Sequence, residues 1–129
     1  MNIGFLGLGK LGLPVSLAVE SKGHNVFGYD ISTQTINDIK NKKIRYREKW
    51  INKYLPKTKL KITNIDNLVN NSEIIFVPIQ TPHDPLYEGI TRIPNKRIDF
   101  DYSFLKSGIK DLSEAIEKNK KDKVVIIIS

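Results

Sequence analysis

Cysteine is absent from the sequence. Its absence excludes disulfides, thiolate metal sites and a cysteine nucleophile within these residues.

No apolar run approaches the roughly 20 residues that span a bilayer, so we expect no membrane partner. Met1 leads directly into an apolar segment with no charged region before it, so we expect no signal peptide and a cytoplasmic location.

The charge balance of the chain is basic. It carries 21 Lys and Arg residues against 14 Asp and Glu residues, for a formal net charge of +7. Such an excess can attract nucleic acid, membrane surfaces or phosphorylated ligands. Specific nucleic-acid surfaces usually use Arg forks and interleaved aromatics, whereas Lys dominates here. We therefore interpret the excess as compositional and expect no nucleic-acid partner.

Short apolar runs alternate with amphipathic segments along the chain. Strands are predicted at about 3–7, 25–29, 60–63, 74–77 and 124–128, the last fully buried, and helices at about 10–22, 33–41, 64–70 and 102–119. This alternation predicts an α/β fold, with a doubly wound parallel sheet and helices on both faces. The last predicted strand has the apolar pattern of a strand in the middle of a sheet, and a doubly wound sheet normally continues beyond such a strand. We therefore interpret the chain as incomplete at the C-terminus.

The segment 42–61 gives a weaker pattern. It is rich in Lys, and its larger apolar and aromatic residues recur at roughly helical spacing. These residues are Tyr46, Trp50, Ile51, Tyr54 and Leu55. We expect the aromatics to pack a helix rather than to form a base-stacking platform.

A glycine-rich turn follows the first predicted strand. Gly7, Gly9 and Gly12 form a G-x-G-x-x-G pattern that includes Lys10 and Leu11 and opens a predicted helix. In that context Gly7 permits the tight turn, Gly9 lets backbone approach a pyrophosphate, and Gly12 lets the helix pack closely on the strand. Free amides and the positive dipole end at the helix start favour phosphate groups. The pattern predicts a Rossmann-type dinucleotide site.

Asp30 completes the pattern, because it ends the second predicted strand 18 residues after Gly12. A carboxylate at this point can accept hydrogen bonds from both adenosine ribose hydroxyls. It would repel a 2′-phosphate, and no Arg follows closely to offset that repulsion. We therefore predict NAD rather than NADP as the cofactor.

Gln80 and Thr81 follow the strand that ends at Val77. Ligands of doubly wound folds lie beyond the carboxyl ends of the strands, so Thr81 is placed to touch the cofactor. The loop 80–101 that begins here is rich in proline, Pro94 included, and loops of this length are usually functional.

The remaining candidates for acid–base or metal chemistry are weaker. His24 lies between a helix and a strand at the wrong end of the sheet for catalysis. His83 and Asp84 lie on the ligand side, but adjacent residues rarely converge on one atom. Asp99 and Asp101 are expected to anchor the loop and cap the next helix. We predict no catalytic and no metal-ligating residue in this chain.

The motifs together resemble the N-terminal domain of the UDP-glucose/GDP-mannose dehydrogenases. Gly7 to Pro14 is similar to the strand-G-L-G-x-x-G-L-P opening of that family, and Asp30 matches its ribose-binding acid. Thr81-Pro82 is similar to its V-x-T-P segment, and Val124–Ser129 looks like the strand into its S-T-V motif, with Ser129 as the serine. The resemblance implies NAD contacts from Thr81 and Ser129.

Three features depart from the family pattern. A Lys is frequent five residues after the acid, whereas this chain has Thr35. The E-P-G-L segment after the second helix is replaced by a stretch around Tyr46-Arg47-Glu48, and the loop 83–98 is longer than usual. These departures leave the sugar nucleotide open.

The resemblance implies that the full-length protein oxidises the C6 alcohol of a nucleotide sugar to a carboxylate in two NAD-dependent steps. That chemistry uses a cysteine, which these residues lack, so residues 1–129 are expected to bind cofactor and catalyse nothing. A homo-oligomer is implied only for the full-length protein. Alternatives are a dehydrogenase of the 3-hydroxyacid or 6-phosphogluconate type, a non-catalytic nucleotide-binding module, or a basic nucleic-acid-binding domain.

Overall fold

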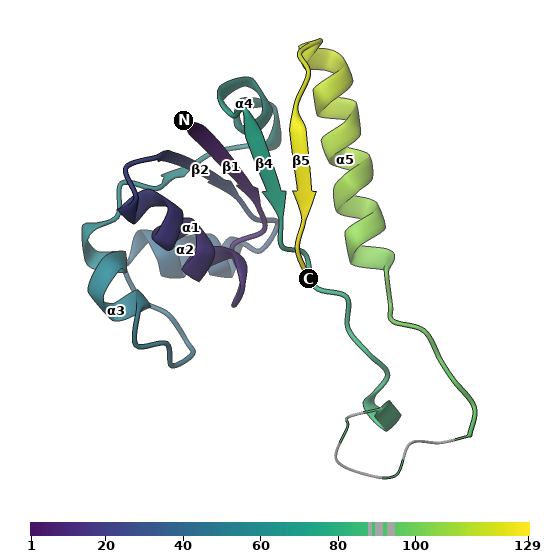
Figure 1. Ribbon diagram of the computed structural model, residues 1–129. Coiled ribbons are helices and arrows are strands. Elements are labelled where there is room, and N and C mark those ends of the chain that lie inside the picture. The colour runs from purple at the N-terminus through teal and green to yellow at the C-terminus, as the bar shows by residue number, and fades with distance from the viewer. Residues whose placement is uncertain (88, 90–91, 93–94) are drawn as a thin grey trace.

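The computed structural model describes residues 1–87, 89, 92 and 95–129. These residues contain five strands, five α-helices and two short 3-10 helices, with at least one helix between successive strands (Figure 1). In chain order they are β1 Asn2–Leu6, α1 Gly12–Ser21, β2 Asn25–Tyr29, α2 Thr33–Lys40, α3 Ile51–Tyr54, η1 Leu55–Lys57, β3 Lys61–Ile62, α4 Ile65–Asn71, β4 Ile74–Val77, η2 Pro85–Tyr87, α5 Ser103–Asn119 and β5 Val124–Ile127.

The five strands form one parallel sheet in the order β3-β2-β1-β4-β5. The first strand lies at the centre, with Ile3 opposite Val26 on one side and opposite Ile74 on the other. All carboxyl ends of the strands therefore meet at one edge of the sheet, which is where a doubly wound fold places its ligands.

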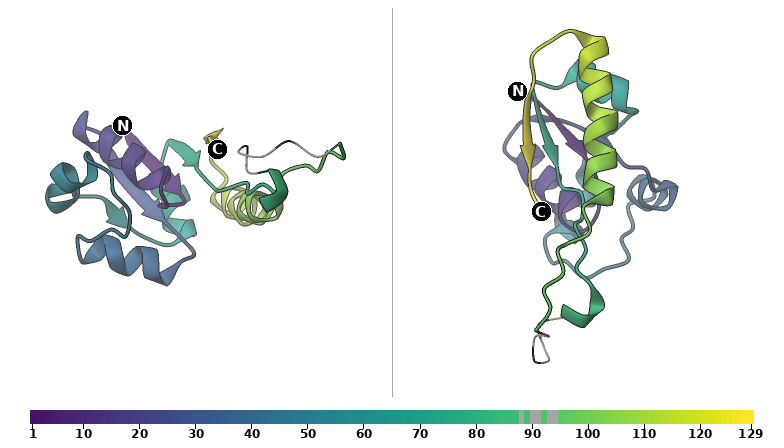
Figure 2. Two further views of the ribbon diagram at one scale, coloured as in Figure 1. Left: turned by 90° about the horizontal axis from the view of Figure 1, so that it is seen from below. Right: turned by 90° about the vertical axis from the view of Figure 1, so that its right-hand side faces the viewer.

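Helices cover both faces of the sheet, as the sequence predicts. On one face Ile3 and Phe5 of β1 pack with α1, α2 and α3, and Phe5 stacks on Phe76 of β4. On the other face Leu6 of β1 packs with α4 and α5. Figure 2 shows α5 running beside the last two strands. The alternation of side chains along each strand thus separates two apolar cores.

Side-chain oxygens cap two of the helices. Ser32 Oγ accepts a hydrogen bond from the Thr35 amide at the start of α2, at 3.2 Å. Asn64 Oδ1 accepts one from the Asn67 amide at the start of α4, at 2.8 Å. Each satisfies an amide that has no partner within its helix, and both helices begin where the sequence predicts them.

Asn64→Ala is expected to lower the free energy of unfolding by about 1 kcal/mol, because it removes the oxygen that caps α4. Urea denaturation of the variant measures this loss. Asn37→Ala in α2 is the matched control, since Asn37 is exposed within a helix and Ala has the better helix propensity there. A stability of Asn64→Ala equal to that of Asn37→Ala would show that the cap contributes nothing.

The prediction that the last strand is fully buried is wrong. The exposed fractions of Val124 and Ile127 are 56% and 53%. Strand β5 lies at the edge of the sheet and pairs only with β4 among the described residues. An apolar run that resembles a central strand therefore stands at the margin of this sheet.

The segment 42–61 is only partly helical. Its one α-helix, α3, has four residues and continues into η1. Ile51 and Leu55 are buried against α1, and Tyr46 and Tyr54 pack at the edge of the same core, as expected. Burial raises the pKa of the Tyr46 hydroxyl. Trp50 does not follow the expectation, because its ring is half exposed.

The connection from β4 to α5 leads away from the sheet. Helix η2 lies well beyond the carboxyl ends of the strands, as Figure 1 and the right-hand view of Figure 2 show. The Asp101 amide donates to the Pro82 carbonyl at 2.8 Å, which joins the two arms of the connection near its base. Pro94, which the sequence places in this loop, lies outside the described residues.

Candidate functional site

The turn between β1 and α1 has the geometry that its glycines predict. Gly7 adopts φ of +116°, and its amide donates to the Tyr29 carbonyl at 2.8 Å. A Cβ on Gly12 would lie well inside van der Waals contact of the Gly7 carbonyl oxygen and 2.8 Å from Pro78 Cγ. Gly12 is buried and serves the packing of α1, and it does not line the large cleft described below.

The start of α1 leaves backbone amides without partners. Its N-cap residue, Leu11, makes no capping hydrogen bond through its side chain. No hydrogen bond to a described residue is donated by the amides of Gly9, Lys10, Leu11 or Gly12. A Cβ on Gly9 would meet no atom within 4 Å, so the space beside Gly9 is open. This is the arrangement in which a helix N-terminus receives an anion.

Asp30 lies directly beside this turn. Its Oδ2 accepts a hydrogen bond from the Leu8 amide at 2.7 Å, and its Oδ1 accepts one from the Ser32 amide at 2.8 Å. The carboxylate is part-buried, and each oxygen keeps a further lone pair for another donor. Asp30 therefore fastens the glycine turn to the end of β2 while it remains able to accept hydrogen bonds from a diol.

One cleft of about 770 Å³ joins these groups at the carboxyl ends of β1, β2, β4 and β5. A volume of this size is typical of cofactor pockets. Of the predicted site residues, all but Gly12 line it, and these are Gly7, Gly9, Lys10, Leu11, Asp30, Gln80, Thr81 and Ser129. Thr35, which stands where a Lys is frequent in the family, lines the cleft as well.

The sequence did not indicate that α5 forms one wall of the cleft. Phe104, Ser107, Gly108 and Asp111 face it, at helical positions i, i+3, i+4 and i+7. A Cβ on Gly108 would overlap Ile79 Cδ1, so the glycine lets α5 approach the end of β4. The sequence does contain a sign of this wall, because these four residues form a second stripe along α5, beside its apolar stripe, and one of them is a glycine.

Ile31 is a second residue that the sequence did not single out. It follows Asp30, lines the cleft, and its side chain is 88% exposed. An apolar side chain exposed beside a carboxylate that can accept from a ribose suits the flat face of a base. Position alone, directly after the acid, could have indicated it.

The other acidic and histidine candidates lie outside the cleft. His24 lies between α1 and β2, at the opposite end of the sheet. His83 is exposed, and Asp84 Oδ1 accepts from the Leu86 amide at 2.9 Å in a local turn. No group of three or more potential metal ligands occurs within the described part of the chain.

Asp99 and Asp101 anchor the loop before α5, as the sequence predicts, but neither is the N-cap of the helix, which is Tyr102 with no capping hydrogen bond from its side chain. Asp99 Oδ1 accepts from the Phe100 amide at 2.8 Å and from the Tyr102 hydroxyl at 3.1 Å, which raises the pKa of Tyr102. Asp101 Oδ1 accepts from the Ser103 amide at 2.9 Å, and its hydrogen bonds with Ser103 lower the pKa of its carboxyl group. These contacts are local, and neither residue lines the cleft.

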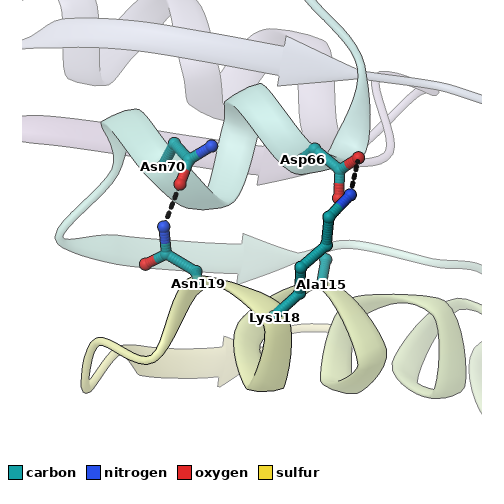
Figure 3. A pocket seen from close by; sticks show the side chains of 5 residues that line it. All are labelled: Asp66, Asn70, Ala115, Lys118 and Asn119. Atoms are coloured by element: carbon teal, nitrogen blue, oxygen red, sulfur yellow. Dashed lines mark hydrogen bonds and ion pairs between the residues drawn. The ribbon is translucent and has the colours of Figure 1, made fainter.

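A second, smaller hollow of about 270 Å³ lies between α4 and α5 (Figure 3). Its polar side chains pair with each other, since Lys118 Nζ lies 3.0 Å from Asp66 Oδ2 and Asn119 donates to Asn70. The hollow therefore joins two helices and offers a ligand little that is free.

The larger cleft fits a dinucleotide. Unpartnered amides and Lys10 suit a pyrophosphate, the Asp30 carboxylate suits a ribose diol, and the apolar Ile31 suits a base. These groups come from elements far apart in sequence, and the parallel sheet brings them to one edge. Within the described residues, no helix is both long and apolar enough to cross a membrane.

Comparison with known proteins agrees with this geometry. The chain is 29% identical over 125 residues to a UDP-N-acetyl-D-mannosamine dehydrogenase of Pyrococcus horikoshii, an alignment that covers 92% of this chain and 26% of the relative. It is also 29% identical over 124 residues to a UDP-glucose 6-dehydrogenase of Rickettsia felis, covering 92% of this chain and 25% of that protein. The chain thus spans about a quarter of the length of these relatives.

Solved structures show the same fold. A GDP-mannose dehydrogenase of Pseudomonas aeruginosa matches with a TM-score of 0.82 at 22% identity, over 98% of this chain and 28% of the other. The UDP-D-ManNAc dehydrogenase of Pyrococcus horikoshii matches with a TM-score of 0.75 at 29% identity, with the same coverage. The family model of the NAD-binding domain matches residues 1–129. The chain belongs to the UDP-glucose/GDP-mannose dehydrogenase family, of which it carries the NAD-binding domain.

Proposed function

We propose that NAD lies in the cleft with its pyrophosphate at the amides that open α1 and its adenosine ribose at Asp30. One observation carries this placement: the amides of residues 9–12 donate to no described residue, and Gly9, Lys10 and Leu11 line the same cleft as Asp30, whose carboxylate still has acceptor capacity. The helix dipole and the amides stabilise the phosphates, and Asp30 accepts from the ribose hydroxyls.

The remaining lining residues position the rest of the cofactor. Lys10 and Leu11 line the cleft beside the turn, where Lys10 adds a full positive charge next to the pyrophosphate. Gln80, Thr81 and Ser129 stand at the ends of β4 and β5, where a hydroxyl or a backbone amide can hold the nicotinamide half. The cofactor itself supplies hydride acceptance, and these residues bind and orient it.

We further propose that the whole protein is a nucleotide-sugar 6-dehydrogenase that oxidises a sugar C6 alcohol to a carboxylate. The support is the family and the names of its relatives, which act on UDP-glucose, GDP-mannose or UDP-N-acetylmannosamine. The nucleotide sugar itself, the cytoplasmic location and a homo-oligomer stay predictions. That residues 1–129 are only the N-terminal part of a larger domain stays a prediction too.

Gly9→Ala tests the placement of the pyrophosphate. A methyl group on Gly9 meets no protein atom, so the variant is expected to unfold at the wild-type temperature. The same methyl group would occupy the space in front of the amides, so NAD affinity is expected to fall by about tenfold or more, roughly 1.4 kcal/mol. Calorimetric titration measures the affinity. An unchanged NAD affinity would place the pyrophosphate elsewhere.

These 129 residues are expected to reduce no NAD by themselves, because the proposed oxidation needs a cysteine and the chain has none. The measurement is the appearance of NADH absorbance with UDP-glucose, GDP-mannose or UDP-N-acetylmannosamine as substrate. NADH formation above the protein-free rate would contradict the prediction that the catalytic residues lie outside residues 1–129.

A further inference from the structure

The positive charge of this protein is concentrated in one stretch, residues 40–61, which we call the basic segment. It holds ten of the 21 Lys and Arg residues but only one of the 14 acidic residues, Glu48, for a net charge of +9. The rest of the chain then carries 11 cations and 13 carboxylates, a net charge of −2. The cations are Lys40, Lys42, Lys43, Arg45, Arg47, Lys49, Lys53, Lys57, Lys59 and Lys61. A general bias of the sequence toward Lys would have spread these cations along the whole chain.

The fold holds the basic segment together at one edge of the molecule. It runs from the last residue of α2 through α3 and η1 to the edge strand β3, and all ten cations are exposed. Lys42 Nζ donates to the Thr58 carbonyl at 3.4 Å, which ties the two ends of the segment to each other. The segment therefore brings cations from its two ends close together. We call its exposed cations the basic surface, except Lys61, whose Nζ lies 5.1 Å from the centre of the Phe27 ring, in the core on the opposite face of the sheet from α3.

Little of this charge is neutralised locally. Among the ion pairs of the described residues, only Arg45 with Asp38, at 2.9 Å, involves the basic segment. Glu20 of α1 also reaches the segment, where its carboxylate accepts from the Thr58 hydroxyl and the Lys59 amide. Most of the cations thus remain available to an external anion, and their summed field attracts polyanions.

An aromatic platform stands within the basic surface. The rings of Trp50 and Tyr54 stack with centroids 4.8 Å apart and planes inclined by 22°. Tyr54 packs at the edge of the core, which fixes the stack, whereas the exposed fraction of Trp50 is 51%. Lys53 Nζ lies 5.5 Å from the centre of the Tyr54 ring. The indole therefore offers an open face that is already held in place among cations.

We propose that the basic surface binds a single-stranded polynucleotide, with a base stacked on Trp50 and the phosphates along the Lys and Arg side chains. Cations that follow a backbone together with an exposed aromatic face are the combination that binds single strands without sequence preference. The sequence-based expectation of no nucleic-acid partner rested on overall composition, and it took no account of where the fold collects the charge. The proposal goes beyond cofactor binding, because no residue of the basic segment lines the NAD cleft.

The structure favours a single strand over other polyanionic partners. Helix α3 has only four residues, too short to read the major groove of a duplex. A membrane-binding surface would present several apolar side chains for insertion, whereas Trp50 is the one exposed large hydrophobic residue of the basic segment. Stacking needs only one flat ring, which this surface has.

The test is the binding of a fluorescent uridine oligonucleotide of about 12 nucleotides, within the site sizes known for such surfaces, to the 129-residue chain over a range of salt concentrations. The first variant replaces Lys42, Lys43, Lys49 and Lys53 by Gln. Its matched control replaces Lys106, Lys110, Lys120 and Lys121 by Gln; these are also exposed, and Lys120 shares the left-handed backbone of Lys42. The third variant is Trp50→Ala.

The basic-surface variant is expected to bind at least tenfold more weakly at low salt, with a salt slope reduced by up to about 3, while the control stays within about twofold of the wild type. Trp50→Ala is expected to lose about tenfold in affinity with an unchanged salt slope, because stacking releases no counterions. NAD titration of every variant should match the wild type, since the cleft is untouched, and thermal unfolding checks that every variant is folded at the temperature of the assay.

Three outcomes would overturn the proposal. The first is no saturable binding of the oligonucleotide by the wild-type chain. The second is equal weakening by both sets of Lys substitutions, which would mean a diffuse attraction without a site. The third is unchanged affinity of Trp50→Ala together with binding to phosphatidylserine vesicles, which would identify a membrane surface instead.

Discussion

Gly12→Ala is expected to lower the free energy of unfolding by about 3 kcal/mol or more, at the upper end of the costs of overpacking. The added methyl group would overlap the Gly7 carbonyl oxygen and come within 2.8 Å of Pro78 Cγ. The first of these atoms is backbone and the second belongs to a ring, so neither can rotate away. Helix α1 would have to move off the sheet, and the buried contacts of Leu13 and Leu17 would move with it.

Urea denaturation of Gly12→Ala beside Gly9→Ala separates the two glycines. Both variants add one methyl group to the same turn, but only the first meets protein atoms. Gly12→Ala should lose stability, and Gly9→Ala should keep it. Equal stabilities would mean that the turn rearranges to accept the methyl group. The close packing of α1 on the sheet would then contribute little to the free energy of unfolding.

The glycine turn and the position of Asp30 could be predicted because the interactions that fix them join residues close together in the sequence. The turn, the helix start and Asp30 lie within 30 residues, and each glycine of the motif has one steric reason to be there. The caps at Ser32 and Asn64 are equally local, since each side chain bonds to an amide three residues ahead. Such interactions leave a recognisable order of residues in the sequence.

Features that depend on distant neighbours could not be predicted in the same way. Val124 and Ile127 have the composition of a central strand, and only the order of the sheet shows that they lie at its edge. The helical spacing that places Ile51 and Tyr54 in the core would also bury Trp50, but α3 is too short to continue the stripe. The cleft-facing side of α5 is likewise defined by what lies opposite it.

Asp30 acts in both the fold and the site, a combination that the sequence did not indicate. Its two oxygens accept from the Leu8 and Ser32 amides, so the residue that would hold the ribose also fastens the glycine turn to β2. Because the turn carries the unpartnered amides, Asp30 would position the proposed phosphate site as well as the proposed ribose site. A substitution at Asp30 therefore changes stability and affinity together, and an informative experiment has to separate them.

Asp30→Ala is expected to weaken NAD binding by about 1.5–3 kcal/mol, the usual scale for hydrogen bonds to a charged group. Calorimetric titration measures the affinity, and Asp30→Asn is the matched variant because it keeps the size of the side chain without its charge. The discriminating quantity is the ratio of NAD to NADP affinity. A purely structural role would lower both affinities alike, whereas a carboxylate at the ribose repels a 2′-phosphate, so both variants should narrow the preference for NAD. A preference for NAD that persists in Asp30→Asn would place the ribose away from this carboxylate, whatever the loss of stability.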